Sequence, residues 1–200
     1  MKRLLFTGLI MLGLGAAHAQ EGYAIGAEVQ DFSLKNIDGE MVSLSDFADQ
    51  EGVIVVFTCN TCPYAVAYEE RIIDLANSYN EKGWPVLAIQ PNDPGRSPGD
   101  SYDKMVARAD EKGYGFPYVF DQSQDITRAF GATRTPHVYL LQVSDGKFVV
   151  RYIGSIDDNP QDASGVETKY VEEAIEALKA GTAVPRESTK AIGCGIKWAS

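Results

Sequence analysis

Two cysteines separated by two residues are the feature of this sequence best suited to chemistry. Cys59 and Cys62 lie in the segment CNTCP at positions 59–63, after a run of β-branched residues and before a stretch with helical periodicity. A thiolate at a helix N-terminus is stabilised by unpaired N–H groups and by the helix dipole. The spacing therefore predicts dithiol–disulfide exchange, in which Cys59 attacks a substrate disulfide and Cys62, one helical turn later, resolves the mixed disulfide.

Two other uses of this cysteine pair remain open from the residues alone. The pair could provide half of a zinc site, or it could form an inert structural disulfide. A zinc site needs two more ligands, and only His137 and Cys194 remain among cysteines and histidines once the first nineteen residues are excluded. For His137, the simpler interpretation is a strand residue with a hydrogen-bonded ring, rather than a metal ligand or proton donor.

The third cysteine, Cys194, is far from the pair in the sequence and stands between Gly193 and Gly195. It could be an additional redox thiol that folds back onto the pair, a thiol that packs as a small hydrophobe, or a cross-link to another chain. The two glycines would allow the backbone to approach another segment closely. The sequence leaves all three roles open.

The segments around the cysteines predict alternating strands and helices. The continuous β-branched run 53–58 suits a central strand buried on both faces. Apolar residues at helical spacing predict a helix over 63–80, and Pro63 suits its first turn. Asn92 follows the strand predicted over 85–89, where it either borders a site or lies in a solvated turn. Similar patterns predict strands over 85–89, 117–120, 137–141 and 148–153, and helices over 102–112, from 121–124 onward, and over 168–180.

This order of elements predicts an α/β fold with a central mixed β-sheet and helices on both faces. The strand–helix–strand unit over 53–89 should form a right-handed parallel crossover. A turn at Asp145-Gly146 predicts an antiparallel hairpin, and a second hairpin is predicted as an N-terminal extension over 28–44. We expect residues 20–200 to form a single domain with an irregular C-terminal tail from about residue 181.

The first nineteen residues have the features of a signal peptide. Lys2 and Arg3 precede an apolar run, and Ala17-His18-Ala19 is a small-residue cleavage site. We therefore expect export, to the periplasm or beyond the cell, without membrane insertion, because the apolar run is too short to span a bilayer. The net charge of −10 and the lack of a basic cluster argue against nucleic acid as a partner.

Three motifs together resemble a known group of proteins: FTCNTCPY at 57–64, TPHV at 135–138 and IGCGIKW at 192–198. Over about residues 26–178 the sequence resembles the redoxin group of thioredoxin-fold proteins, which includes thiol–disulfide oxidoreductases and peroxiredoxin-like proteins. The resemblance implies a thioredoxin-like fold. It also implies a cis peptide bond at Pro136, facing the cysteines, and a role for Thr135 in orienting substrate.

Three functions follow from these observations. We predict an oxidoreductase that uses Cys59 and Cys62 on a disulfide-containing protein or small thiol, with a redox partner that regenerates the dithiol. Since the dithiol is itself the redox centre, neither an organic cofactor nor a metal is expected. The first alternative is a thiol peroxidase, although the Pro-x-x-x-Thr-x-x-Cys pattern of peroxidatic cysteines is not present around Cys59 or Cys62. The second is a metal-binding or delivery module that combines the pair with His137 or Cys194.

Overall fold

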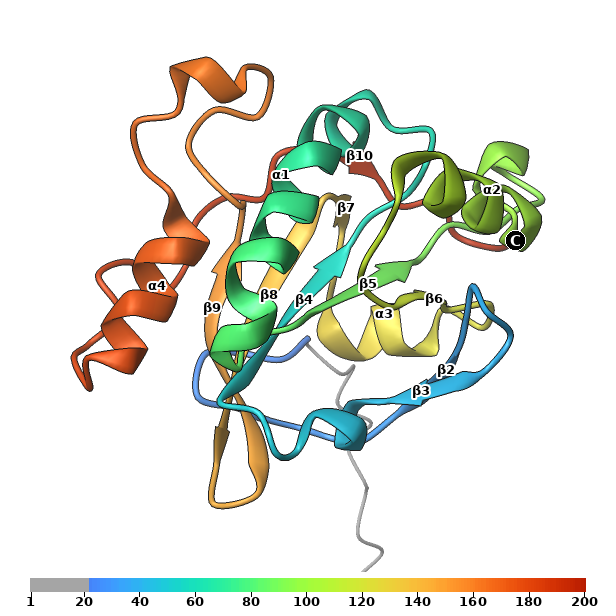
Figure 1. Ribbon diagram of the computed structural model, residues 1–200. Coiled ribbons are helices and arrows are strands. Elements are labelled where there is room, and N and C mark those ends of the chain that lie inside the picture. Colours follow the sequence, from blue (N-terminus) through green and yellow to red (C-terminus); the bar gives the residue numbers. More distant parts are fainter. Residues whose placement is uncertain (1–21) are drawn as a thin grey trace, which may run out of the picture.

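The computed structural model describes residues 22–200 (Figure 1). The predicted signal peptide at 1–19 lies outside the described residues. Within them, one mixed sheet has the strand order β1-β9-β8-β4-β5-β6-β2-β3, and a small second sheet pairs β10 with β7. The strands are β1 Glu28–Val29, β2 Ser33–Asn36, β3 Met41–Ser43, β4 Gly52–Phe57, β5 Val86–Gln90, β6 Tyr118–Phe120, β7 Arg134–Thr135, β8 His137–Ser144, β9 Lys147–Gly154 and β10 Cys194–Gly195. The α-helices are α1 Pro63–Tyr79, α2 Tyr102–Lys112, α3 Asp125–Phe130 and α4 Tyr170–Lys179, and short 3-10 helices cover Leu44–Phe47, Asn80–Lys82, Pro98–Asp100 and Ala163–Gly165.

The centre of the sheet confirms the predicted mixed topology. β4 pairs in parallel with β5, and β5 pairs in parallel with β6. β8 runs antiparallel to β4 and continues through the turn at Asp145-Gly146 into β9. The helical stripe predicted on 63–80 is also confirmed, since the apolar residues of α1 at 65, 68, 72, 75, 76 and 79 are all buried.

The N-terminal segment 28–44 differs from the predicted single hairpin. β2 and β3 form a hairpin that joins the sheet beside β6, but β1 pairs with β9 near the opposite edge. Six strand spacings in a flat sheet would separate β1 from β2 by roughly 29 Å. The four residue steps from Val29 to Ser33 can span only about 14 Å. The sheet is therefore strongly curled, which the sequence pattern did not indicate.

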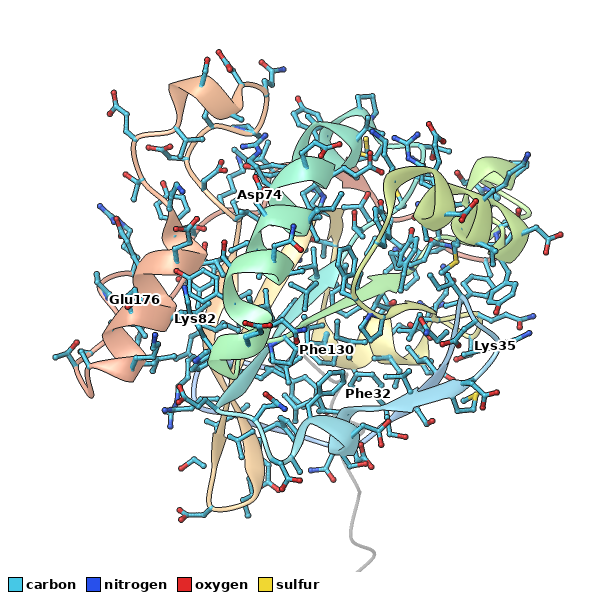
Figure 2. The ribbon with its side chains drawn as sticks, viewed as in Figure 1. Phe32, Lys35, Asp74, Lys82, Phe130 and Glu176 are labelled. Carbon is cyan, nitrogen blue, oxygen red and sulfur yellow. The ribbon has the colours of Figure 1, made fainter. Side chains whose placement is uncertain are left out.

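Helices cover the two faces of this sheet unequally. Ile54 and Val56 of β4 belong to a core that includes buried residues of α1, α2 and α4. The alternating residues Val53, Val55 and Phe57 point into a second core with α3 and the N-terminal segment. Figure 2 shows Phe32 and Phe130 meeting in this second core, with their ring centroids 5.9 Å apart. β4 is buried on both faces, as predicted, and so is a rigid support for the residues that follow it.

Helix α1 is fixed along one side by a buried carboxylate. Glu69 accepts hydrogen bonds from Arg108 Nε at 2.8 Å, Arg108 Nη2 at 2.9 Å and the Tyr114 hydroxyl at 2.7 Å. Burial alone would raise the pKa of Glu69, but these hydrogen bonds lower it below its ordinary value. The group therefore stays ionised and ties α1 to α2 at neutral pH.

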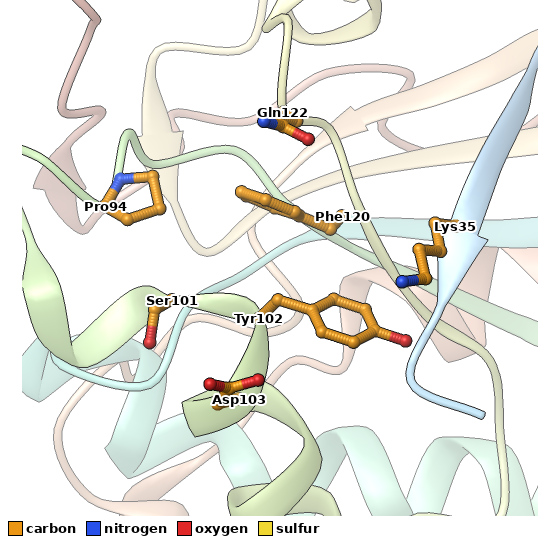
Figure 3. A pocket seen from close by; sticks show the side chains of 7 residues that line it. All are labelled: Lys35, Pro94, Ser101, Tyr102, Asp103, Phe120 and Gln122. Carbon is orange, nitrogen blue, oxygen red and sulfur yellow. The ribbon is translucent and has the colours of Figure 1, made fainter. Parts of the chain in front are cut away.

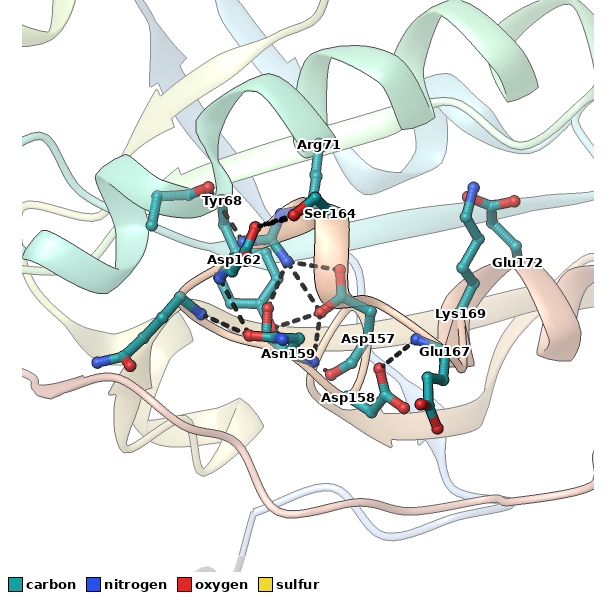
Figure 4. A network of polar contacts seen from close by, with 12 residues as sticks. Tyr68, Arg71, Asp157, Asp158, Asn159, Asp162, Ser164, Glu167, Lys169 and Glu172 are labelled. Carbon is teal, nitrogen blue, oxygen red and sulfur yellow. Dashed lines mark hydrogen bonds and ion pairs between the residues drawn. The ribbon is translucent and has the colours of Figure 1, made fainter.

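A second ion pair fixes the other side of α1. Arg71 Nη1 donates to the carboxylate of Asp157 at 2.7 Å and to the carbonyl of Asn159 at 2.7 Å (Figure 4). The Tyr68 hydroxyl donates to the same carboxylate at 2.9 Å. The side chain of Asp157 is only 3% exposed, so its charge depends on these partners. The segment after β9 is thereby bound to α1.

We predict that replacing Arg71 with methionine lowers the free energy of unfolding by about 3 kcal/mol, because the charge of Asp157 remains buried without its partner. The matched control is Lys147→Met. This change breaks the ion pair between Lys147 and Glu28, whose side chains are 57% and 45% exposed, respectively. The control substitution should lower the free energy of unfolding by less than about 1 kcal/mol. Urea unfolding of both variants measures the difference, and equal losses would contradict the assignment.

Candidate active site

The two cysteines lie where β4 leads into α1, as predicted, but Cys62 occupies a different position from the one expected. Helix α1 starts at Pro63, and Cys62 is its N-cap with an extended backbone at φ −71° and ψ 124°. A proline disfavours helical backbone in the residue before it, which explains why the helix does not include Cys62. The helix start predicted at residue 63 is therefore confirmed, whereas the expectation that Cys62 lies one helical turn beyond Cys59 is wrong. Cys62, rather than Cys59, stands at the helix N-terminus.

Thr135 contacts the sulfur atoms of both cysteines. Its Oγ1 lies 3.3 Å from Cys59 Sγ, and its carbonyl accepts a hydrogen bond from the Cys62 thiol at 3.1 Å. Thr135 is completely buried, and its peptide bond to Pro136 is cis, as the resemblance implied. The structure thus brings Thr135 and Pro136 beside the cysteine pair.

The C-terminal tail brings the third cysteine to the same place. β10 pairs antiparallel with β7, and Cys194 is opposite Thr135 in this pairing. The backbone N–H of Cys194 donates to Cys62 Sγ at 3.3 Å. Figure 1 shows β10 next to the N-terminal end of α1. Cys59, Cys62 and Cys194 therefore form one cluster, although all three are free thiols in this structure.

The three thiols differ in how strongly their surroundings stabilise the negatively charged thiolate. The neighbouring thiols of Cys59 and Cys194 and the N–H of Cys194, which donates to the sulfur, lower the pKa of Cys62 to about 4, against the opposing effect of burial. The pKa of Cys59 is raised by its hydrogen bond to Cys62, by burial and by the negative charge of Asp100. The carbonyl of Thr135 favours the protonated form of Cys62, but the neighbouring thiols and N–H groups favour the thiolate more strongly, so negative charge is better stabilised on Cys62 than on Cys59.

A buried carboxylate holds the two residues between the cysteines. Asp100 Oδ1 accepts the backbone N–H groups of Asn60 at 2.9 Å and Thr61 at 3.1 Å. Its Oδ2 accepts hydrogen bonds from the Thr61 hydroxyl, Ser97 Oγ and Asn92 Nδ2. Sequence reasoning missed Asp100, because it lies some forty residues from the cysteines in a loop rich in proline and glycine. Asn92, left open by the sequence, is buried and belongs to this network rather than to a solvated turn.

His137 is a buried strand residue. Its Nδ1 accepts the backbone N–H of Thr133 at 3.4 Å, and burial lowers its pKa to about 4, so the ring is neutral near pH 7. This matches the simpler of the two interpretations of His137. Among residues 22–200, no group of three or more His, Cys, Asp or Glu side chains is placed to hold a metal ion. The metal-binding alternative therefore has no set of ligands in this part of the chain.

A pocket of about 380 Å³ lies away from the cysteines, between β2, β6 and the start of α2 (Figure 3). Its lining includes Lys35, Tyr102 and Phe120 but none of the three thiols. The ammonium group of Lys35 lies 4.3 Å from the centre of the Tyr102 ring, where it already has a partner. The pocket carries no group suited to thiol chemistry.

Comparison with known proteins connects this geometry to a family. Residues 25–158 match the AhpC/TSA family. The chain belongs to the AhpC/TSA family. A solved structure of a hypothetical protein from Sinorhizobium meliloti 1021 has 30% sequence identity and a TM-score of 0.81, and the match covers 90% of this chain and 97% of that one. A lipoprotein thioredoxin from Streptococcus pneumoniae has 19% identity and a TM-score of 0.56, covering 74% of this chain and 99% of that one, which confirms the thioredoxin-like fold alone.

Among proteins of named activity, the chain is similar to the thiol-disulfide oxidoreductase ResA of Halalkalibacterium halodurans. The two are 24% identical over 184 residues, which is 88% of this chain and 93% of ResA. The ResA protein of Bacillus cereus is 26% identical over 160 residues. Together with the family match, these relatives confirm the predicted oxidoreductase class. Within the described residues, no helix is both long enough and apolar enough to cross a bilayer.

We predict that Cys62 reacts as a thiolate at unusually low pH. Since its pKa is about 4 instead of 9.0, its alkylation by iodoacetamide should keep a constant rate from about pH 8 down to about pH 5 and fall only near pH 4. Peptide mass spectrometry after timed alkylation measures the rate at each cysteine. Cys59→Ala should raise the pKa of Cys62, whereas Cys59→Ser, which retains a hydroxyl donor, should raise it less. A rate for Cys62 that falls tenfold per pH unit below about pH 8 would contradict this prediction.

We predict that Asp100→Ala lowers the free energy of unfolding by about 3 kcal/mol, because several buried donors lose their acceptor. The same change removes a negative charge near Cys59, so the pKa of Cys59 should fall. Asp103→Ala is the control, since Asp103 is an exposed acid on the first turn of α2. This substitution should lower the free energy of unfolding by less than about 1 kcal/mol. Urea unfolding and thiol titration measure the two effects. Equal stability of the two variants would show that Asp100 does not hold the segment between the cysteines.

Proposed function

We propose that this chain is an exported thiol–disulfide oxidoreductase whose redox centre is the Cys59–Cys62 dithiol. The observation that carries the proposal is the position of Cys62, which is the N-cap of α1 and whose sulfur accepts the Cys194 N–H in a cluster with Cys59. Such surroundings stabilise a thiolate, the form that attacks disulfides. Membership of the AhpC/TSA family and similarity to ResA are consistent with this chemistry.

In this mechanism the two cysteines exchange the roles that the sequence suggested. The Cys62 thiolate attacks one sulfur of a substrate disulfide, forms a mixed disulfide and releases the first substrate thiolate, which takes a proton. Cys59 then loses its proton and attacks the Cys62 sulfur. The Cys59–Cys62 disulfide closes, and the second substrate thiol leaves reduced. The raised pKa of Cys59 keeps it protonated until Cys62 has lost its negative charge in the mixed disulfide.

Thr135 supports both steps in the proposed mechanism. Its hydroxyl lies beside Cys59 and can accept the thiol proton in a hydrogen bond, and its carbonyl lies beside Cys62. The cis Thr135–Pro136 segment brings these two groups to opposite cysteines of the pair. We assign Thr135 and Pro136 to positioning, because the electrons move only among sulfur atoms. No organic cofactor or metal takes part in this scheme.

The substrate in this proposal is a disulfide-containing protein or a small disulfide, and a second redox partner returns the centre to the dithiol. The signal-peptide features of residues 1–19 favour an extracytoplasmic location. Such compartments are oxidising, so a reductase there needs a supply of electrons.

The proposal predicts a reversible two-electron couple. Titration in glutathione buffers, read by thiol labelling and mass spectrometry, should find a Cys59–Cys62 disulfide with a potential between about −270 and −120 mV, the range of this fold. Cys194→Ser should keep this couple, whereas Cys62→Ser should abolish it. Absence of any reversible couple in both the unmodified chain and Cys194→Ser would refute the proposal. Rapid peroxide consumption with oxidation of Cys62 to a sulfenic acid would favour the thiol peroxidase instead.

A further inference from the structure

The C-terminal tail is held against the active site by specific contacts along its length. Upstream of Cys194, Thr189 N–H donates to the carbonyl of Ile153 at 2.9 Å. Downstream, Lys197 N–H donates to Asn92 Oδ1 at 2.8 Å, and the Lys197 carbonyl accepts from Gln124 Nε2 at 2.9 Å. Ile196 is buried in the second core. Segments on both sides of Cys194 are therefore anchored, which fixes the thiol over Cys62.

The tail also fits tightly against the backbone of Thr135. A Cβ atom added at Gly193 would overlap the carbonyl group of Thr135 and reach to 3.1 Å from Pro136 N. At Gly195, by contrast, the nearest atom to an added Cβ would be Arg134 Nη1 at 3.9 Å. Neither glycine has a positive φ, so the requirement for glycine at 193 comes from space rather than from backbone conformation. The close approach at Gly193 sets how near Cys194 comes to Cys62.

The pairing of β10 with β7 has the form of peptide recognition by strand addition. β7 has two residues, and within the described chain its strand partner is β10. A peptide that binds by strand addition uses main-chain hydrogen bonds for affinity and presents alternate side chains to the protein. Here the added strand belongs to the chain itself, and the side chain presented is a thiol.

We propose that Cys194 is a third redox-active thiol, presented to Cys62 by the tail as an internal substrate, and that it forms a Cys62–Cys194 disulfide during the cycle. This inference rests on the proposed oxidoreductase function and extends it to the tail.

The exchange balances without any further reactant. Starting from the Cys59–Cys62 disulfide, the Cys194 thiol gives its proton to water or buffer and its sulfur attacks Cys62 Sγ. The bond between Cys194 and Cys62 forms as the bond between Cys62 and Cys59 breaks, and Cys59 leaves as a thiolate that takes up a proton. The number of disulfides is unchanged. Burial and the neighbouring Cys62 thiolate raise the pKa of Cys194 to about 11, and the charge part of this effect disappears once Cys62 is in a disulfide.

Cys194 is more accessible than the pair, because Cys59 and Cys62 are 6% and 4% exposed while Cys194 is half-buried. Transfer to Cys194 therefore moves one sulfur of the disulfide from the buried pair to the tail. A partner that regenerates the dithiol could then reach the disulfide without entering between Cys59 and Cys62. This gives the third thiol a use that the pair alone does not supply.

The first test uses full-length Cys59→Ser protein with oxidised glutathione as the probe. Glutathione should first form a mixed disulfide with Cys62, which Cys194 then resolves. Tryptic peptide mapping under non-reducing conditions should find the peptide of Cys62 joined to that of Cys194 in most molecules. A lasting glutathione adduct on Cys62 together with a free Cys194 would overturn the proposal.

The second test compares two alanine substitutions in the same Cys59→Ser background, where all other contacts are unchanged. Gly193→Ala should slow formation of the Cys62–Cys194 disulfide by about tenfold or more. The added methyl group prevents the tail from packing against the backbone of Thr135, so the effective concentration of the Cys194 thiol at Cys62 falls. Gly195→Ala should change the rate less than about twofold. Circular dichroism and thermal unfolding check that both variants fold. Equal rates for the two variants would overturn the proposed role of the contact between Gly193 and the backbone of Thr135.

A third measurement separates this inference from the proposed function. Cys194→Ser keeps both cysteines of the pair, so glutathione titration of this variant tests the Cys59–Cys62 couple alone. If the couple is present but the Cys59→Ser variant forms no Cys62–Cys194 disulfide, the inference fails and the proposed function stands. If the couple is absent, the proposed function fails as well.

Discussion

The proposed chemistry depends on one electrostatic requirement, which is to hold a negatively charged sulfur at the N-terminus of a long helix. Pro63 ends the extended chain and starts α1, so that Cys62 becomes the N-cap. Hydrogen bonds from Cys59 and Cys194 then favour the thiolate over the thiol. These donors converge because β7 directly precedes β8, which pairs with β4, and because the tail strand β10 pairs with β7. In the proposed mechanism, the reactivity of Cys62 thus depends on where one helix begins.

The rest of the fold keeps that helix from moving. Glu69 connects α1 to α2, and Arg71 connects α1 to the segment after β9. Asp100 holds the two residues between the cysteines from a third direction. Each of these contacts involves a buried or nearly buried carboxylate, which is costly to place in a protein interior unless its partners are fixed. These directional polar contacts fix the position of α1, whereas apolar packing alone would let the helix shift along its axis.

The sequence predicted those parts of the structure that local pattern determines. The β-branched run before Cys59, the helical stripe after Pro63 and the turn at Asp145-Gly146 each act within a few residues, and all three were located correctly. The cysteine pair was recognised from its spacing. Asp100 and the pairing of Cys194 with Thr135 were not predicted, because they join segments about 40 and 60 residues apart with no periodic signal. The start of the helix at Pro63 was also predicted correctly, but the placement of Cys62 one helical turn beyond Cys59 was wrong, because a proline disfavours helical backbone in the residue before it.

The contact between Cys194 and Cys62 joins residues 132 positions apart in the chain, and this has a consequence for folding. A protein made from its N-terminus exposes the cysteine pair long before the last ten residues exist. Contacts of such long sequence separation form late, because closing a large loop costs entropy that few local interactions repay. Completion of the active site is thus expected to be one of the last events in folding, and a chain shortened at its C-terminus would fold with its reactive sulfur uncovered.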